Sequence, residues 1–389
     1  MRGTFRLVLA ALLALACRPA PPVKMDARRV FQSVAGIMDT SRFNMISSIY
    51  ASPDGTVWIV WVDWGFWRTA RASAWHTQRF SGVGDPLGKD VILSSSQLLG
   101  SITGAYPVGT TPDGSLVLDL DQSHPNDMSR LAKIGPSGAT EVTDVLPGHF
   151  MGQPFVDRDG IADVLVVSGS PSNYMQVDMK ARGLPVMRSL SYDRPFNGLA
   201  SVPEYLRWGA GRRGMPGEIA FLSEQQGRLL VATPRHDSSG LLYGVYRIRT
   251  RTLALIDSGS INLTRDVYRT WSGPVIRRSV IVPAHDAGYW IFTPTSDTPP
   301  SPTVVAFRLG PNLKVIRPSS VSAGVAEPFV AVPRGAAVSA WSKFAFKERW
   351  ENGAWVVPAK LKLSFIAFDG DGRLYTQTFE DSITSRVTK

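Results

Sequence analysis

The chain has 389 residues, 44% hydrophobic and 19% charged, with a single cysteine and a formal net charge of +10. This composition excludes wholesale disorder, and one cysteine excludes both an intrachain disulfide framework and a zinc site built on several cysteines. The basic residues are dispersed, and their densest groups are Arg28-Arg29, Arg212-Arg213, Arg277-Arg278 and the triplet Arg247, Arg249 and Arg251. Because nucleic-acid-binding proteins concentrate basic residues on one element, we expect no nucleic-acid partner.

Residues 1–16 have the pattern of an export signal. Arg2 and Arg6 precede an unbroken apolar run, LVLAALLALA, at Leu7–Ala16. The run is too short to span a bilayer as a helix, which takes about 20 residues. It has the length of the hydrophobic region of a signal peptide, so we expect 1–16 to be a signal peptide.

The only cysteine, Cys17, follows this run directly, in the segment LALAC. The segment resembles bacterial lipoprotein signals, in which a cysteine after small or apolar residues is lipid-modified and becomes the mature N-terminus. The resemblance implies lipid attachment at Cys17 and an extracytoplasmic, membrane-anchored protein. Because Arg18 rather than an aspartate follows, it favours the periplasmic side of the outer membrane. The alternative is an ordinary signal peptide cleaved near Ala16.

Residues 17–39 are then a lipid-anchored spacer and lead-in. The segment RPAPP at Arg18–Pro22 predicts a short polyproline II spacer. Beyond residue 40 the sequence shows no helical apolar period, and short β-branched or aromatic runs alternate with Gly, Pro, Asp and Asn. This pattern predicts β-hairpins.

Two kinds of hairpin alternate along the chain. The first has an apolar strand, an Asp-Gly-like turn and a strongly hydrophobic strand, and its turn glycines are Gly55, Gly114, Gly160, Gly227, Gly288 and Gly335. A second hairpin follows each of them, as in RLAKIGPSGATEVTDV at 130–145. Two hairpins make one four-stranded antiparallel unit, and six such units account for residues 40–381.

Six four-stranded units in tandem predict an all-β fold, a six-bladed β-propeller over residues 40–389. The pattern resembles the propellers of the NHL and TolB-like kind, whose blades also carry a hairpin like TPDGSLVL at 111–118. A pair of β-sandwiches is the alternative, but it would not require the same unit six times. The strand Arg373–Phe379 is expected to be an outer strand, and Arg29–Ile37 to lie against it or cap the ring.

A candidate metal loop lies in the third unit. Asp157, Asp159 and Asp163 have a D-x-D-G-x-x-D spacing that resembles the calcium loops of integrin-like propellers. Carboxylates at such spacing can converge on a hard cation. The alternative is that Asp-Gly serves the hairpin turn alone. We expect no cofactor, with calcium at this loop as the alternative.

Tryptophan is concentrated between residues 58 and 75, where Trp64, Phe66, Trp67 and Trp75 lie close in sequence. Strand alternation prevents all these aromatic side chains from facing one side. We therefore expect the segment from Trp64 to Trp67 in a loop at the propeller rim, where aromatic side chains can contact a partner or ligand. Packing within the blade is the alternative.

Two further motifs are weak. GAGRRG at 209–214 matches G-x-G-x-x-G, but Pro216 and a strand follow instead of a helix, so no dinucleotide site is expected. Arg212 and Arg213 remain candidates for contact with an anionic ligand. ASPDGTVW at 51–58 resembles the Asp-box of sialidases with one residue missing, and that box has a structural role.

The sequence contains no H-E-x-x-H, no G-x-S-x-G and no P-loop, and we assign no catalytic residue. Three functional classes remain. The expected one is a protein-binding or accessory subunit at the cell envelope, with an envelope protein as its partner. The alternatives are a binder of a small ligand or glycan at the propeller mouth, and a hydrolase or lyase with a dispersed active site there.

Overall fold

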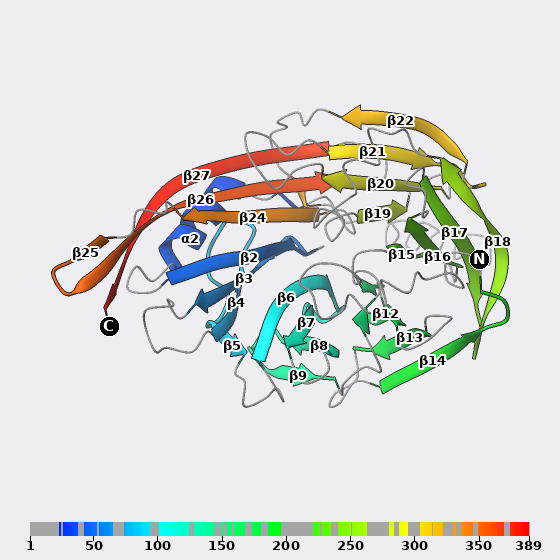
Figure 1. Cartoon of the computed structure of the whole chain (residues 1–389), viewed down its shortest axis with the longest axis horizontal. Helices are drawn as coiled ribbons and strands as arrows, with labels where there is room; N and C mark the ends of the chain where they lie inside the picture. The colour runs from blue at the N-terminus through cyan, green and yellow to red at the C-terminus, as the bar shows by residue number, and fades with distance from the viewer. Residues whose placement is uncertain are drawn as a thin grey trace, which may run out of the picture.

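In the residues that it describes, the computed structural model is all-β, with one short helix near the N-terminus (Figure 1). It describes residues 23–24, 26–37, 43–52, 54–64, 74–93, 101–123, 128–143, 149–150, 154–157, 159–167, 173–179, 186–195, 221–225, 228–234, 240–249, 251–262, 280–283, 288–294, 304–312, 314–321, 330–331, 336–344, 349–368 and 374–388. Among these residues, no helix is both long enough and apolar enough to cross a membrane.

Five antiparallel units of four strands follow one another along the chain. Unit 1 has β2 (Phe43–Ala51), β3 (Val57–Trp64), β4 (Ala74–Phe80) and β5 (Val91–Leu93). Unit 2 has β6 (Ser101–Thr110), β7 (Leu116–Ser123), β8 (Met128–Ile134) and β9 (Thr140–Val142). Unit 3 has β11 (Phe155–Val156), β12 (Ile161–Val167), β13 (Asn173–Asp178) and β14 (Val186–Tyr192), and β10 (His149–Phe150) also pairs with β12.

Unit 4 has β15 (Phe221–Gln225), β16 (Arg228–Pro234), β17 (Gly240–Ile248) and β18 (Thr252–Asn262). Unit 5 has β19 (Val280–Pro283), β20 (Tyr289–Pro294), β21 (Val304–Leu309) and β22 (Val315–Val321). The last unit has β24 (Ala336–Phe344), β26 (Ala354–Phe368) and β27 (Leu374–Thr388), with β25 (Arg349–Glu351) forming a hairpin with β26. The pairing within units 1 to 5 confirms the two alternating hairpins in each of them. Units 3 and 4 also join into one nine-stranded sheet, because β14 pairs parallel with β18, and unit 1 joins the last unit in one eight-stranded sheet.

The turn glycines have the backbone conformation that the hairpins require. Gly55, Gly114 and Gly160 have φ of 80°, 78° and 77°, a region in which glycine avoids the steric cost of a Cβ. One predicted hairpin is wrong. β23 (Val330–Ala331) pairs with β1 (Val23–Lys24) near the N-terminus instead of with β24, and the two strands form a separate two-stranded sheet.

Apolar cores lie between successive units, because strand residues point alternately to the two faces of their sheet. On β7, Leu116 and Leu118 pack with Trp58 and Val60 of unit 1, whereas Val117 packs in the core shared with unit 3. On β12, neighbouring residues likewise divide between the cores shared with units 2 and 4. Units 2 and 3 therefore bury both faces against their neighbours.

The first strands of the units lie next to one another. β2 contacts β6, β6 contacts β11, β11 contacts β15, and β15 contacts β19, while Ile49 of β2 pairs with Val338 of β24. A Cβ added to Gly109 of β6 would lie 2.5 Å from Val156 Cβ on β11, which shows how closely two of these strands approach. In Figure 1 the units follow one another around the molecule in chain order, from blue through green to red. A β-propeller requires this arrangement.

The helix α2 (Ala27–Ile37) lies against the C-terminal strand. Asp26 caps it, since its Oδ1 accepts the Arg29 N–H at 3.1 Å. Val30 and Val34 are fully buried, and the Phe31 ring stacks on Phe379 of β27 with centroids 5.5 Å apart. This contact confirms the expectation that Arg29–Ile37 lies against the outer strand of the last unit.

The same helix is also attached to unit 1. The Asp26 N–H donates to the Gly82 carbonyl at 2.7 Å, Ser33 Oγ donates to the Gly84 carbonyl, and Arg29 Nη2 lies 3.6 Å from Asp85 Oδ1. α2 therefore bridges the first and last units of the chain.

Candidate functional site

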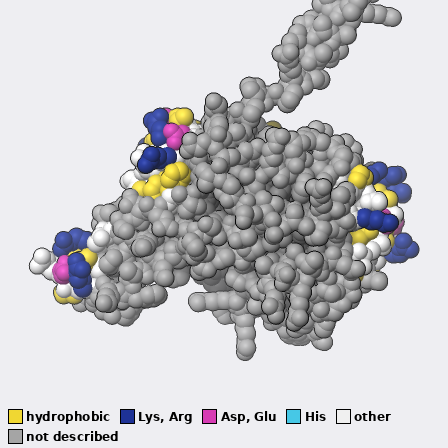
Figure 2. Space-filling model, turned by 90° about the horizontal axis from the view of Figure 1, so that it is seen from above, with side chains coloured by type: hydrophobic (Ala, Val, Ile, Leu, Met, Phe, Trp, Pro, Cys, Tyr) yellow, Lys and Arg dark blue, Asp and Glu magenta, His cyan; other side chains and the backbone are white. Residues whose placement is uncertain are grey.

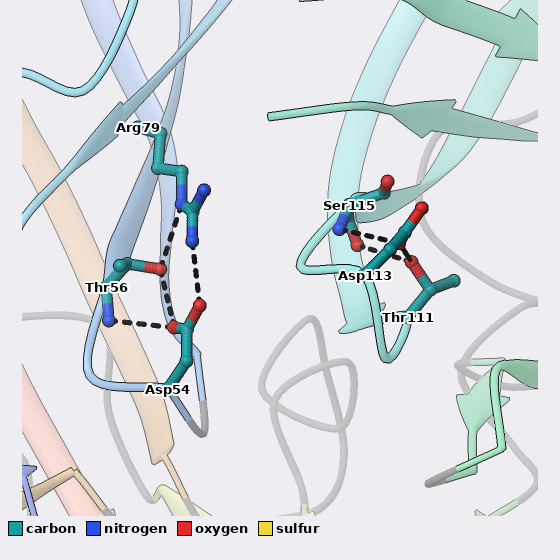
Figure 3. A network of polar contacts seen from close by, with 6 residues as sticks. All are labelled: Asp54, Thr56, Arg79, Thr111, Asp113 and Ser115. Atoms are coloured by element: carbon teal, nitrogen blue, oxygen red, sulfur yellow. Dashed lines mark hydrogen bonds and ion pairs between the residues drawn. The ribbon is translucent and has the colours of Figure 1, made fainter. Parts of the chain in front are cut away.

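The turn between β2 and β3 carries a compact polar cluster (Figure 3). Asp54 Oδ1 accepts the Thr56 N–H at 2.9 Å and the Thr56 hydroxyl at 2.7 Å. From β4, Arg79 Nη2 donates to Asp54 Oδ2 at 2.7 Å and Arg79 Nε donates to Thr56 Oγ1 at 3.1 Å. The guanidinium also lies 5.8 Å from the centroid of the buried Trp58 ring. Charge, hydrogen bonds and a cation–π contact thus fix this turn.

In the corresponding turn of unit 2, an aspartate likewise accepts hydrogen bonds from neighbouring residues of the turn. Asp113 Oδ1 accepts the Thr111 hydroxyl and the Ser115 N–H, the latter at 3.2 Å. Lys133 Nζ lies 4.0 Å from Asp113 Oδ2 and 3.6 Å from Glu141 Oε2. Partial burial alone would raise the pKa of Asp113, but the hydrogen bonds from Thr111 and Ser115 and the charge of Lys133 lower it below its usual value.

The two turns lie side by side at the seam between units 1 and 2. A Cβ on Gly114 would be 3.4 Å from Arg79 Nη2 and 3.6 Å from Asp54 Oδ2. Each carboxylate is thus occupied in holding its own turn. This agrees with the structural role of the Asp-box that 51–58 resembles, and it leaves Asp54 and Asp113 as parts of the scaffold.

Tyr50 lies at the same seam, and burial raises its pKa from 10.0 to about 12, with a smaller contribution from the charge of Asp54. Because the folded pKa exceeds the unfolded one, this stabilisation is complete below pH 10 and is lost as pH rises towards 12. We expect the loss to reach about 2 kcal/mol, measured as a fall in melting temperature between pH 9 and about 11.5. Tyr50→Phe should reduce this fall, and an unchanged pH profile would contradict the assignment.

The candidate calcium loop does not assemble. Asp157 Oδ1 accepts the N–H groups of Asp159 at 2.8 Å and Ile161 at 2.9 Å, so it caps the turn. Asp163 is buried in β12 and accepts the Tyr174 hydroxyl at 2.6 Å and Gln176 Nε2 at 3.1 Å. The described residues contain no group of three or more His, Cys, Asp or Glu side chains that could hold a metal ion. The carboxylates of the alternative calcium loop do not come together in this structure, because Asp157 caps the turn and Asp163 is engaged within the strand.

A histidine–aspartate pair was not anticipated from the sequence. His76 Nδ1 lies 2.7 Å from Asp90 Oδ2, and the ring stacks on Trp61 with centroids 5.1 Å apart and planes 11° apart. An aspartate orients the catalytic histidine in hydrolytic triads in the same way. However, the His76 side chain is only 7% exposed, and Nε2 has no hydrogen-bond partner within the described part of the chain. We assign His76 to the core of unit 1.

The predicted aromatic contacts divide into three groups. Trp75 is buried in the core between units 1 and 2, and its indole N–H donates to the Ile102 carbonyl at 3.0 Å, so it is a packing residue. Trp64 is the last residue of β3, paired with Phe43, and does not lie in a loop as expected. The remaining predicted residues all lie outside the described part of the chain: the contact residues Phe66, Trp67, Arg212 and Arg213, and the lipid-attachment residue Cys17.

The clearest charged surface is formed by Arg228, Arg247, Arg249 and Arg251 at one end of unit 4, and we call it the arginine end. Arg228 of β16 and Arg247 of β17 occupy directly opposed positions, and all four residues are exposed. None takes part in an ion pair within the described part of the chain. Dark blue side chains gather over β17 and β18 at the right-hand end of the molecule in Figure 2.

Removing one arginine from the opposed pair should stabilise the fold. Like charges directly opposite in a sheet destabilise it, so we expect Arg247→Thr to raise the free energy of unfolding by about 0.2–1 kcal/mol at low salt. Screening should shrink this gain in 0.5 M salt, where the Debye length is only a few Å (~4 Å). Arg386→Thr is the matched control, since exposed Arg386 faces Val356 across β26 and β27. Urea unfolding measures the free energy of unfolding of both variants. Equal changes in Arg247→Thr and Arg386→Thr would contradict the repulsion between Arg228 and Arg247.

No protein-family model and no curated protein matches this chain. Among solved structures, the chain is similar to the β-propeller domain of the Trilobed protease from Pyrococcus furiosus, at 8% identity over 88% of this chain and 98% of that chain, with a TM-score of 0.42. It is also similar to a mutant of AofleA from Arthrobotrys oligospora, at 9% identity over 90% and 91% of the two chains, with a TM-score of 0.43.

A third similar structure is the GH43_1 enzyme from Xanthomonas citri complexed with xylotriose, at 10% identity over 90% of this chain and 96% of that chain, with a TM-score of 0.33. All three similarities are weak. The architecture of this chain therefore stands on its own strand pairing and inter-unit cores.

Proposed function

We propose that the chain is a six-bladed β-propeller, anchored through Cys17 to the periplasmic side of the outer membrane. Its role is that of an accessory subunit that binds an acidic envelope protein through the arginine end. Units 1 to 5 and the last unit supply the six blades, and α2 joins the last blade to the first. The lipid anchor is proposed from the position of Cys17 after the apolar run.

The observation that carries the binding role is the charge of the arginine end, which has no ion-pair partner among the described residues. Arg228 and Arg247 face each other, and Arg249 and Arg251 lie in the turn that joins β17 to β18. Opposed like charges cost stability in the free protein. Carboxylates of a partner would remove that repulsion on binding, and complementary charge would speed the encounter.

A charge reversal tests the surface. The Arg247→Glu, Arg249→Glu double variant and an Arg386→Glu control are purified with their anchors from detergent-solubilised envelope, and the co-purifying proteins are quantified. We expect a stoichiometric acidic partner with wild type and with the control, and at least about a tenfold loss with the double variant. Equal recovery with both variants would contradict the proposal, provided that circular dichroism shows both to be folded.

The anchor has its own test. Cys17→Ser should move the protein out of the membrane fraction after a high-salt wash, because a chain without acyl groups lacks the stable attachment that two or more acyl chains give. A Cys17→Ser protein that remains with washed membranes would overturn the lipid attachment. This result would leave the arginine end untouched as a binding surface.

A further inference from the structure

Exposed large apolar side chains are concentrated in one short segment of unit 1, from Val83 to Ile92. Among the described residues five large hydrophobic side chains are exposed, and three of them lie between positions 83 and 92: Val83 at 42%, Leu87 at 37% and Ile92 at 53%. The other two, Ile256 and Trp350, are in different units. Apolar side chains that gather at one place on a surface mark a contact site.

These three residues follow the outer edge of the unit. The Leu87 N–H donates to the Arg79 carbonyl at 2.7 Å and Pro86 bridges to Phe80, so the chain after β4 folds back along that strand. Ile92 lies on β5, which pairs with β4 alone among the described strands. The edge from Val83 to Ile92, which we call the unit 1 edge, is therefore the outer side of the first unit.

The chain that would carry the lipid begins, in the described residues, at β1, which pairs with β23 and starts three residues before Asp26. The Asp26 N–H donates to the Gly82 carbonyl at 2.7 Å, and β1 begins at Val23. Cys17 precedes Asp26 by nine residues, so even a fully extended chain places the acylated residue within about 30 Å of Gly82. A domain of this length has a diameter of about 50 Å. The segment between Cys17 and Asp26 is thus too short for the far side of the molecule to lie against the membrane.

Charge at the unit 1 edge is balanced. The exposed charged residues around it are three basic ones, Arg28, Arg29 and Lys89, and three acidic ones, Asp26, Asp85 and Asp90. A balanced surface needs no anionic lipid for attraction. Apolar side chains among balanced charges match the boundary between headgroups and acyl chains of a neutral bilayer.

From these observations we propose that the unit 1 edge is a second membrane contact, with Val83, Leu87 and Ile92 inserted into the bilayer interface beside the lipid anchor. The proposal rests on lipid attachment at Cys17. It orients the protein: unit 1 lies on the membrane, and the arginine end of unit 4 points away from it.

The lone cysteine makes this testable. In the acylated protein Cys17 has no free thiol, so the cysteine of a Val83→Cys variant can be labelled alone with an environment-sensitive fluorophore. The labelled, acylated full-length mature chain is inserted into phosphatidylcholine vesicles with and without spin-labelled lipid. We expect a blue-shifted emission that spin-labelled lipid quenches about twofold or more, since an interfacial side chain sits about 5–10 Å deep. Leu87→Cys should give the same result.

Ile256→Cys is the matched control, because Ile256 is similarly exposed, at 45%, but belongs to unit 4. Its label should show no quenching. Equal quenching at residues 83 and 256, or none at 83 and 87, would overturn the membrane contact. If the label at residue 83 is shielded from water in solubilised envelope complexes but exposed in vesicles, a partner protein covers the unit 1 edge. That result would also overturn the membrane contact.

Failure of the anchor is recognised separately. If the wild-type protein takes up the thiol label, Cys17 carries no lipid and the proposed attachment fails. If Cys17 is acylated by mass spectrometry and the label at 83 is still unquenched, only the unit 1 edge is wrong.

Discussion

Replacing Gly84 with alanine should detach α2 from unit 1 and lower the free energy of unfolding by about 2–4 kcal/mol. Gly84 has a φ of +89°, where an L-residue is strained. A Cβ there would lie 2.7 Å from both the carbonyl carbon and the oxygen of Arg29 and 2.9 Å from Val30 N. These are backbone atoms of the helix, so the clash can be relieved only if α2 and the turn at Gly84 move apart.

Gly88→Ala separates the clash from the backbone strain. Gly88 has a similar φ of +93°, but the nearest atom to its added Cβ is the Pro136 oxygen at an ordinary 3.5 Å. Both variants carry the strain, and only Gly84→Ala displaces the helix. Denaturant unfolding should show the larger loss for Gly84→Ala, and trypsin should cleave after Arg28 and Arg29 about tenfold faster in that variant. Matching losses and cleavage rates in the two variants would contradict the docking of α2.

The hairpins could be predicted from sequence because their signals are local. Asp113 and Gly114 predict a turn, and the apolar residues from Leu116 onward predict a buried strand. β23 could not be predicted in the same way. Its partner, β1, lies about 300 residues earlier in the chain, and no local pattern identifies so distant a strand.

The sequence of helix α2 contains a local pattern from which the helix could be predicted. Asp26 stands at the capping position, and Val30, Phe31 and Val34 then form one apolar face. The candidate sites were harder to predict from the sequence, because the spacing of residues alone does not show which way a side chain points. Trp75 faces a core rather than a rim, and the partner of His76, Asp90, comes from a loop that folds back along β4.

Loss of the Tyr174 hydroxyl should have the second large effect on stability. Tyr174 of β13 and Asp163 of β12 are both buried, and the Tyr174 hydroxyl donates to Asp163 Oδ1 at 2.6 Å. Burial first, and then the charge of Asp163, raise the pKa of Tyr174 well above its usual value, so the hydroxyl remains a donor. Tyr174→Phe deprives a buried carboxyl of a hydrogen bond without changing the apolar packing of the ring. We expect a loss of about 1–3 kcal/mol.

Tyr243→Phe provides the comparison, because Tyr243 also donates to an aspartate. Its hydroxyl lies 3.4 Å from Asp257 Oδ2, and Asp257 is exposed. Water can replace a donor to an exposed carboxylate, so this variant should lose less than about 0.5 kcal/mol. Urea unfolding at pH 7 compares the two. Equal losses would show that the burial of Asp163 contributes nothing to the strength of the hydrogen bond. The Tyr174–Asp163 pair would then no longer explain why an aspartate occupies this position in β12.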